Sequence, residues 1–396
     1  MGERADVVII GAGIVGLSLA KEIARRGVGD VLVLEKEDAL GRHASGRNSG
    51  VLHAGIYYAP DSRKAKTCLA GNRLMRAYCQ EKGLPLLECG KVIVARDAAE
   101  LPILDELALR AAANGARVEM LDEKALAEVE PSARTVGRAL WSRMTAVVDP
   151  HEVLQSLRAD LEASGRVRIR TGVELLAAAG PAAVRTTAGE VGYGRLVNAA
   201  GAHCDKVARL FGVGEHYRLI PFKGIYRKLR KDARLVVNGN IYPVPDPRNP
   251  FLGVHFTRSV HGDVYLGPTA IPAFGRENYG ILAGVDSDAP RIAFEDAVLF
   301  FRNAGFRSVA LSEPRKYIPA FLHRDAARLV HGFDPSEVEP AEKVGIRPQL
   351  VDWRTKQLLM DFIVERSGNT LHVLNPISPA FTSSMELARQ VVAEHF

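Results

Sequence analysis

Three glycines near the start of the chain have a spacing that suits the binding of a dinucleotide. They lie in the sequence Gly11-Ala-Gly13-Ile-Val-Gly16, directly after the β-branched run Asp6–Ile10. Gly11 allows a sharp turn, Gly13 lets a diphosphate approach the backbone, and Gly16 lets a helix pack closely on the strand. A purely structural strand-to-helix turn is the alternative interpretation.

An acidic residue stands where a ribose-binding carboxylate is expected. Glu35 follows the second predicted strand, Val31–Leu34, and lies about 20 residues beyond Gly16, the spacing typical of this group. Its carboxylate would accept hydrogen bonds from both ribose hydroxyls, which argues against a 2′-phosphate and hence against NADP. The helix N-terminus at Ile14 and Val15 would direct its N–H groups at the diphosphate. The choice between NAD and FAD needs residues elsewhere in the chain.

The elements around this motif form a complete β-α-β unit, in which the helix continues to Arg26 and is stopped by Gly27 and Gly29. Other periodic segments predict helices at Leu101–Asn114, Glu123–Val129 and Glu152–Ala163, strands at Val167–Thr171 and Glu190–Val197, and a helix from about Ala380. Between about Leu210 and Gly345 the sequence is rich in Pro, Gly and aromatic residues, as in Tyr242–Pro250. This texture of strands and turns predicts a second, mostly antiparallel domain.

Length and composition limit the classes of protein. The 396 residues, 47% hydrophobic and 25% charged, are typical of a soluble globular chain of two or three domains, or of one large cofactor domain with an insertion. The net charge of +6 suits acidic metabolites, anionic lipid or nucleic acid without choosing among them. The four cysteines have neither metal-ligand spacing nor a disulfide pattern, so we predict no metal site and a cytoplasmic location. No segment is long and apolar enough to span a membrane, so any membrane contact would be peripheral.

The chain resembles the D-amino-acid-oxidase-like family of FAD oxidoreductases, and within it the L-2-hydroxyglutarate dehydrogenases and oxidases. Besides the N-terminal glycines and the strand Leu196–Gly201, the resembling segments are Ser45–Tyr58, Pro221–Tyr226, Tyr242–Thr257, Gly267–Tyr279, Gly345–Leu350 and His372–Ser384. They extend over nearly the whole chain.

The resemblance implies an FAD cofactor in an extended conformation, and we expect it to be noncovalent because no Cys or His stands in a covalent-flavin motif. Glu35, with Lys36 beside it, would hold the adenosine ribose, and the backbone at Val173 would meet the adenine edge. The other residues that the resemblance assigns to FAD are Gly11, Gly13, Ile14, Val15, Gly16, Ser45, Asn48, Ser49, Ala200, Gly201, Pro379, Ala380 and Thr382. The last three would aim the N-terminus of the final helix at the pyrimidine edge of the flavin, where reduction builds negative charge. A plain polar loop at 45–49 and a simple strand end at 199–201 are the alternatives.

The resulting fold class is α/β (α+β overall), with a Rossmann-like FAD-binding domain and a second, mostly antiparallel β substrate domain. We expect the FAD-binding domain to be discontinuous, formed by residues 1–90, 145–210 and 345–396. The substrate domain would then comprise residues 91–144 and 211–344.

Two histidines are candidates for the base that removes the hydroxyl proton of a 2-hydroxy acid. A neutral imidazole suits this role because its ordinary pKa lies near working pH. His53 is preferred, because it follows the flavin-binding loop by four residues. His255 lies on an alternating strand of the candidate substrate domain, where either its imidazole or Thr257 would point into the pocket. A buried histidine that only bonds to backbone is the alternative for His53.

A dicarboxylic substrate needs at least two cationic or polar anchors. Arg347 is the candidate for a bidentate clamp on one carboxylate, because its planar guanidinium matches carboxylate geometry; a surface ion pair is the alternative. Lys223, Tyr226 and Arg276 are candidates for the second carboxylate, and Tyr58 for a pocket hydroxyl. Arg143 stands where relatives tend to carry a turn with Pro and Gly, so it would change the charge of any adjacent pocket.

We therefore predict an FAD-dependent 2-hydroxy-acid dehydrogenase or oxidase, which converts L-2-hydroxyglutarate to 2-oxoglutarate by hydride transfer to flavin N5. Quinone or oxygen would accept the electrons. An amino-acid or amine oxidase of the same fold and a noncatalytic flavoprotein are the alternatives. The basic run Lys223–Arg234 is either a solvated face or a contact with the inner face of the cytoplasmic membrane. We expect no nucleic-acid partner, because this run lacks interleaved aromatic residues.

Overall fold

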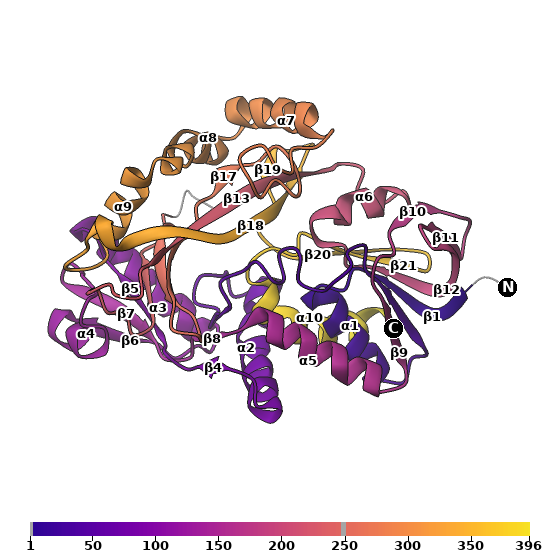
Figure 1. The fold of residues 1–396 in the computed structure, drawn as a ribbon, viewed down its shortest axis with the longest axis horizontal. Helices are drawn as coiled ribbons and strands as arrows, with labels where there is room; N and C mark the ends of the chain where they lie inside the picture. Colours follow the sequence, from indigo (N-terminus) through magenta and orange to yellow (C-terminus); the bar gives the residue numbers. More distant parts are fainter. Residues whose placement is uncertain (1–2, 247–250) are drawn as a thin grey trace. The chain divides into compact units, whose positions relative to one another are not determined.

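The structure, a computed structural model, describes residues 3–246 and 251–396, and the chain divides into two compact units (Figure 1). Unit 1 comprises Met1–Asn48, Pro150–Pro221 and Arg347–Phe396, and unit 2 comprises Ser49–Asp149 and Phe222–Ile346. The predicted division differs from this mainly in its first piece, which was expected to continue to residue 90. Residues 49–90 belong to unit 2 because their strands β3 (Val51–Leu52) and β4 (Leu86–Leu87) both pair with β8 (Ala146–Val148).

Unit 1 is built on a sheet whose centre is parallel. The strand order is β10-β11-β12-β1-β2-β9, and β21 pairs in parallel with the carboxyl-terminal end of β12. The strands are β1 (Glu3–Ile10), β2 (Val31–Leu34), β9 (Val167–Arg170), β10 (Leu175–Ala178), β11 (Ala183–Thr186), β12 (Gly189–Asn198), β20 (Ile363–Ser367) and β21 (Thr370–Leu374). The short strand β19 (Gln357–Leu358) also lies in this unit but pairs with β18 (Val338–Asp352) of the second sheet. The helices are α1 (Ile14–Arg25), α5 (Pro150–Ala163), α6 (Cys204–Arg209) and α10 (Ala380–His395).

The first strand and helix of unit 1 form because their apolar residues face the core. Val7, Val8 and Ile9 of β1 are all buried, as expected for a central strand covered on both faces. Helix α1 buries its apolar residues against α10 and α5, and the chain turns away through Gly27, whose φ is +67°. The predicted β-α-β unit and parallel sheet are confirmed.

The second, mostly antiparallel sheet has the order β19-β18-β13-β16-β15-β14-β5-β7-β6, and from β13 to β6 only the β14–β5 pair is parallel. Besides β3, β4 and β8, the strands of unit 2 are β5 (Lys91–Val94), β6 (Glu119–Asp122), β7 (Arg138–Ser142), β13 (Tyr217–Leu229), β14 (Asn240–Pro243), β15 (His255–Arg258), β16 (Val264–Gly267), β17 (Ile271–Pro272) and β18 (Val338–Asp352). The first residues of β13 and the last of β18 belong to unit 1. The helices are α2 (Arg63–Lys82), α3 (Leu101–Ala113), α4 (Glu123–Val129), α7 (Ala289–Arg302), α8 (Ala304–Ser312) and α9 (Pro319–Ala327).

Both faces of this sheet are covered by apolar residues. Val92 and Val94 of β5 pack in one core with Ile241, whereas Ile93 packs in the other with Tyr242. Because side chains alternate along a strand, Lys91 lies on the same face as Ile93.

The sequence predicted the helices α3, α4 and α5 nearly to the residue, whereas α7, α8 and α9 lie in the region expected to hold only strands and turns. Pro and Gly dominate the texture there, but the amphipathic spacing of Ile292, Glu295 and Leu299 places three buried side chains on one face of α7. Residues 247–250 of the predicted aromatic and Pro-rich segment lie outside the described residues.

A buried histidine links the two strands that end beside the glycine turn. Asn198 Nδ2 donates to His372 Nδ1 over 3.1 Å, and His372 Nε2 contacts Thr370 Oγ1 at 2.9 Å. Because the amide donates to Nδ1, the imidazole is neutral with its proton on Nε2. Burial lowers the pKa of His372 to about 4.

This pKa predicts a pH dependence of stability. Unfolded histidine titrates near 6.5, so between about pH 6.5 and 4 only the unfolded chain takes up this proton, and the free energy of unfolding falls as the pH decreases. His372→Gln keeps one acceptor and one donor without titrating, so its unfolding free energy should fall less over this window. Denaturant titrations of both proteins at pH 7.5 and 4.5 measure this difference, and equal losses would contradict it.

Candidate active site

The turn between β1 and α1 is crowded by backbone. A Cβ on Gly16 would lie 2.0 Å from the carbonyl oxygen of Gly11, and one on Gly11 would lie 2.6 Å from that of Ala199. Gly11 also has a φ of +101°, which side chains other than glycine rarely adopt. Only glycine fits at these two positions, as the motif predicts.

A polar loop at residues 44–48 lies beside the glycine turn, and the turn and this loop are called the cradle. Ser45 Oγ accepts a hydrogen bond from Ile14 N over 3.0 Å, and a Cβ on Gly13 would lie 2.9 Å from this oxygen. Asn48 closes the loop by donating through Nδ2 to the carbonyls of Ala44 and Ser45. The loop therefore presents its polar groups beside the first turn of α1.

The Glu35 carboxylate lies at the carboxyl end of β2 and is oriented by backbone. Oε2 accepts from Ala12 N over 2.9 Å, and Oε1 accepts from Glu37 N over 3.0 Å. A carboxylate has about four lone-pair positions, so it can still accept from two ribose hydroxyls. Val173 N donates to the carbonyl of Glu35, which brings the predicted adenine-edge backbone to this position.

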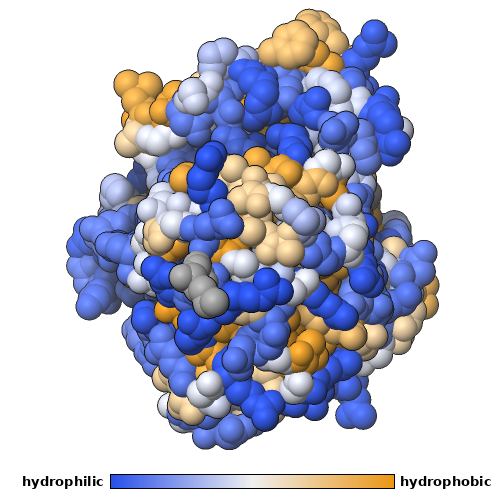
Figure 2. All heavy atoms as spheres, turned by 90° about the vertical axis from the view of Figure 1, so that its right-hand side faces the viewer, coloured by the Kyte–Doolittle hydropathy of each residue, from blue (hydrophilic) through white to orange (hydrophobic). Residues whose placement is uncertain are grey.

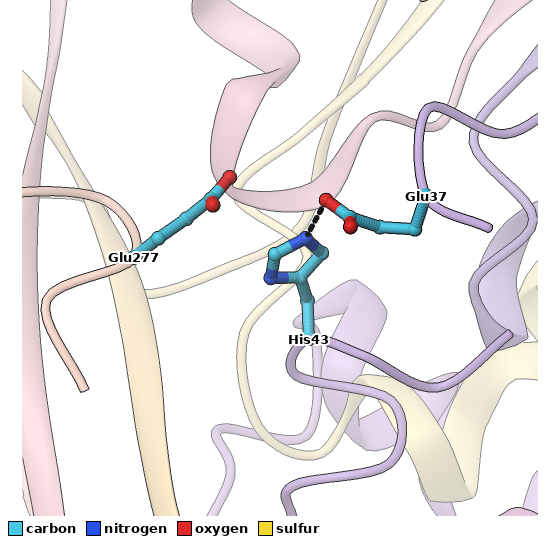
Figure 3. Close-up of side chains that lie close together, drawn as sticks. All are labelled: Glu37, His43 and Glu277. Atoms are coloured by element: carbon cyan, nitrogen blue, oxygen red, sulfur yellow. Dashed lines mark hydrogen bonds and ion pairs between the residues drawn. The ribbon is translucent and has the colours of Figure 1, made fainter. Parts of the chain in front are cut away.

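An ion pair fixes the segment that follows Glu35. Glu37 contacts His43 at 2.8 Å (Figure 3) and its neighbour Lys36 at 2.7 Å. These two partners, Lys36 first, lower the pKa of Glu37 despite its partial burial. Glu277, also drawn in Figure 3, belongs to unit 2. The contact with His43 therefore links the segment after Glu35 to the loop that leads to Ser45.

Two more predicted cofactor segments belong to unit 1. Ala200 N donates to Asn198 Oδ1, which turns the chain at the end of β12 toward Gly201. Helix α10 begins after Pro379 without a side-chain cap, and Thr382 in its first turn is buried. The glycine cradle, the Glu35 carboxylate and these helix starts fit a dinucleotide such as FAD. Ser49, the remaining predicted residue, is the first residue of unit 2.

In unit 2, His255 is held in one tautomer. Its ring stacks on Tyr242 with centroids 3.8 Å apart, and Nδ1 lies 2.8 Å from the carbonyl oxygen of Gly253. A carbonyl can only accept, so Nδ1 carries the proton and the neutral ring has its lone pair on Nε2. This is the form required of a general base.

His53 and Tyr58 belong to a segment held by helices α2 and α3. The carbonyl of His53 accepts from Cys68 Sγ and Asn72 Nδ2 of α2, and that of Tyr58 accepts from Asn114 at the end of α3. His53 is 8% exposed. The backbone of this segment is therefore fixed, and the predicted role of the His53 imidazole stays a prediction.

Two predicted cations are fully buried and already hold protein groups. The Lys223 ammonium donates to Asn278 Oδ1 over 3.1 Å and to the carbonyl of Gly280 over 2.5 Å, and burial lowers its pKa. Arg276 pairs with Asp288 at 3.3 Å. Both side chains fix the segment 274–288, and their contact with a substrate stays a prediction.

The remaining predicted polar residues have different surroundings. Tyr226 is buried beside Tyr265, and Arg347 is partly exposed on the part of β18 that belongs to unit 1. Arg143 is largely exposed and pairs with Glu119 at 2.9 Å, which compensates its charge.

The sequence did not identify Tyr57, Lys91 and Tyr242 as a group. Lys91 Nζ lies over both tyrosine rings, 4.4 Å from the centroid of Tyr57 and 5.0 Å from that of Tyr242. The available signal was a lysine at the start of the apolar strand Lys91–Val94, a residue type rarely found fully buried.

The cradle in unit 1 defines a dinucleotide-binding protein, and comparison with known families identifies the dinucleotide. The DAO family, described as FAD dependent oxidoreductase, matches residues 6–394, so the chain belongs to this family and its predicted FAD cofactor is confirmed. Among named relatives, the mitochondrial L-2-hydroxyglutarate dehydrogenase of Bos taurus is 37% identical, and the alignment covers 98% of this chain and 88% of the relative. The L-2-hydroxyglutarate dehydrogenase of Indibacter alkaliphilus is 35% identical over 98% of this chain and 97% of the relative. That of Escherichia coli is 33% identical over 98% of this chain and 92% of the relative.

Solved structures confirm the predicted fold class, a Rossmann-like FAD-binding domain with a second domain. The L-α-glycerophosphate oxidase of Mycoplasma pneumoniae, determined with FAD bound, has a TM-score of 0.77 at 22% identity and is matched over 98% of this chain and 94% of its own. Glycine oxidase of Geobacillus kaustophilus has a TM-score of 0.73 at 19% identity, over 99% and 94%. At these identities the likeness concerns the fold alone.

None of the helices among the described residues combines the length and apolar character needed to cross a membrane. The face of the molecule in Figure 2 has mostly hydrophilic side chains, with apolar ones interspersed.

The Glu35 geometry predicts how FAD retention responds to substitution. Glu35→Ala removes the ribose acceptor and should weaken FAD binding by about 10- to 100-fold, the usual effect of losing a charge-assisted hydrogen bond. Gly13→Val should also weaken it, because the added side chain meets Ser45 Oγ. Titration of deflavinated protein with FAD measures both.

The matched control is Glu174→Ala, which removes an exposed carboxylate of the same unit and should leave FAD affinity unchanged. Full FAD affinity in Glu35→Ala would contradict the assignment. Flavin that stays attached after denaturation would contradict a noncovalent cofactor.

Proposed function

We propose that this enzyme oxidises L-2-hydroxyglutarate to 2-oxoglutarate. The observation that carries the proposal is the shared name of the relatives: animal and bacterial proteins 33–37% identical over almost the whole chain are all L-2-hydroxyglutarate dehydrogenases. An amino-acid oxidase of the same fold remains the competing function, because solved structures of this fold include glycine oxidase.

The reaction removes a hydride from C2 and a proton from the hydroxyl oxygen of the substrate, and a carbonyl forms. FAD, when bound, supplies the hydride acceptor at flavin N5. His255 takes the hydroxyl proton on Nε2, because the Gly253 carbonyl keeps the other ring proton on Nδ1. His53 is the alternative base.

Arg347 binds one substrate carboxylate through its planar guanidinium. Lys223, Tyr226, Arg276 and Tyr58 are the further predicted substrate contacts. The residues of unit 2 are well fixed for this purpose, since Lys223 and Arg276 both anchor the segment 274–288.

A quinone or oxygen reoxidises the enzyme. In the basic run, Lys228 pairs with Glu339, Arg230 with Asp232, and Arg234 with Glu337, which weakens the support for this run as a membrane contact. Better support for peripheral membrane contact comes from large apolar side chains that are strongly exposed between residues 281 and 318 of unit 2, namely Ile281, Leu282, Phe294, Phe301 and Ile318.

Anaerobic flavin reduction tests the function directly. Mixing with L-2-hydroxyglutarate should bleach the flavin absorbance near about 450 nm, a property of the cofactor, whereas D-2-hydroxyglutarate, lactate, glycine and L-glutamate should bleach it far more slowly. Bleaching by an amino acid alone would establish the competing oxidase. A flavin that no member of this panel reduces would indicate a noncatalytic flavoprotein.

The tautomer of His255 predicts its effect on the chemical step. His255→Gln should slow flavin reduction at saturating substrate by roughly 10²- to 10⁴-fold, the usual contribution of a general base. The parent rate should decrease as the pH falls through the pKa of the base, because imidazolium cannot accept a proton. This decrease at low pH, the acid limb of the pH profile, should be absent in the variant. Stopped-flow reduction across pH measures both effects.

His53→Gln is the matched comparison. If only that variant loses the acid limb, His53 is the base and the assignment of His255 is wrong. If both variants keep it, the histidine mechanism is wrong.

A further inference from the structure

Unit 2 contains a buried lysine whose ammonium group lies over aromatic rings and has no hydrogen-bond partner among the described residues. Lys91 is 1% exposed at the start of β5, between the rings of Tyr57 and Tyr242. No group among residues 3–246 and 251–396 forms a hydrogen bond with its Nζ atom. Isolated buried ammonium groups are costly, and native proteins pair or neutralise them.

Two titratable groups that face Lys91, Cys68 and Tyr57, are uncharged at neutral pH, and Lys64 is a further cation beside Cys68. Burial raises the pKa of Cys68 on α2 to about 12 and that of Tyr57 well above its usual value, and the ring of Tyr242 on β14 separates Lys91 from His255. Burial lowers the pKa of Lys91 to about 7. The lysine therefore loses much of its charge near neutral pH, and a bound carboxylate would restore the ammonium form.

Other polar atoms on this face of the sheet also lack partners among the described residues. They are Asn240 Oδ1 and Thr257 Oγ1, on residues that pair across β14 and β15, and Tyr57 Oη. Asn240 and Thr257 are each 1% exposed. Several unsatisfied buried polar atoms on one face are unusual in a native protein, and each needs a partner that the described residues do not supply.

We propose, on the basis of the function proposed above, that Lys91 binds the distal carboxylate of the substrate and so selects dicarboxylic 2-hydroxy acids. Lys223 and Arg276 already hold protein groups, whereas Lys91 has an ammonium that a carboxylate would complete. Tyr242 is fully buried and the Tyr57 hydroxyl is buried without a partner among the described residues, so both rings would frame a carboxylate bound at Nζ.

Binding of an unreactive dicarboxylate tests this site independently of catalysis. Isothermal titration of the FAD-loaded protein with glutarate should give a dissociation constant that rises about 10- to 100-fold in Lys91→Met, the loss expected for one charge-assisted contact. At pH 8, in buffers of different ionisation enthalpy, the parent should take up close to one proton per glutarate, because the carboxylate restores the ammonium form. Lys91→Met should take up none.

The matched control is Lys343→Met, which removes another largely buried lysine that lies over two tyrosine rings but has Asp149 and Asp263 nearby. Its glutarate affinity should equal that of the parent. FAD content and unfolding temperature establish that both variants are folded. Equal glutarate binding by the parent and Lys91→Met would overturn the proposal.

Flavin reduction by L-2-hydroxyglutarate and by L-2-hydroxyvalerate, which has a methyl group in place of the distal carboxylate, gives the second measurement. Lys91→Met should raise KM for the dicarboxylate and reduce the preference for it, with a smaller change in kcat. An unchanged preference would overturn the proposal. A parent that binds glutarate through Lys91 but does not oxidise L-2-hydroxyglutarate would support the site and refute the proposed function.

Discussion

The approach of Gly16 to the carbonyl of Gly11 is the constraint on which unit 1 depends. A Cβ at residue 16 would lie 2.0 Å from that oxygen, so β1 can connect to α1 through this turn only if residue 16 has no side chain. This contact sets where α1 begins, and hence where Ser45 meets Ile14 N and where Glu35 meets Ala12 N. The cofactor cradle is thus a consequence of one tight turn rather than of separately placed groups.

Unit 2 is organised by a different constraint, the burial of polar groups within an otherwise apolar sheet. One face of β5, β14 and β15 carries Lys91, Asn240 and His255 next to apolar residues such as Ile93. His255 has a backbone partner that fixes its tautomer, whereas Lys91 has none among the described residues. The first arrangement suits proton transfer, and the second suits the binding of an anion.

Local sequence was sufficient for the parts of the fold whose signals are local. The glycine spacing, Glu35 after β2 and the 3.6-residue period of α3 and α5 all depend on neighbours within about 20 residues. The Lys91 group could not be predicted, because residues 91 and 242 meet only when β5 pairs with β14, and residue 57 comes from the loop after β3. For the same reason the sequence could not reveal that Asn278 and Gly280 hold the Lys223 ammonium, or that Asp288 pairs with Arg276.

The order of the strands in unit 1 has a consequence for biosynthesis. Strand β1 and α1 are synthesised long before β21, which completes the sheet beside β12, and α10, which covers α1. Until those two elements are made, the apolar face of α1 is without this cover. A chain that lacks β21 and α10 should therefore be unable to close its cofactor unit.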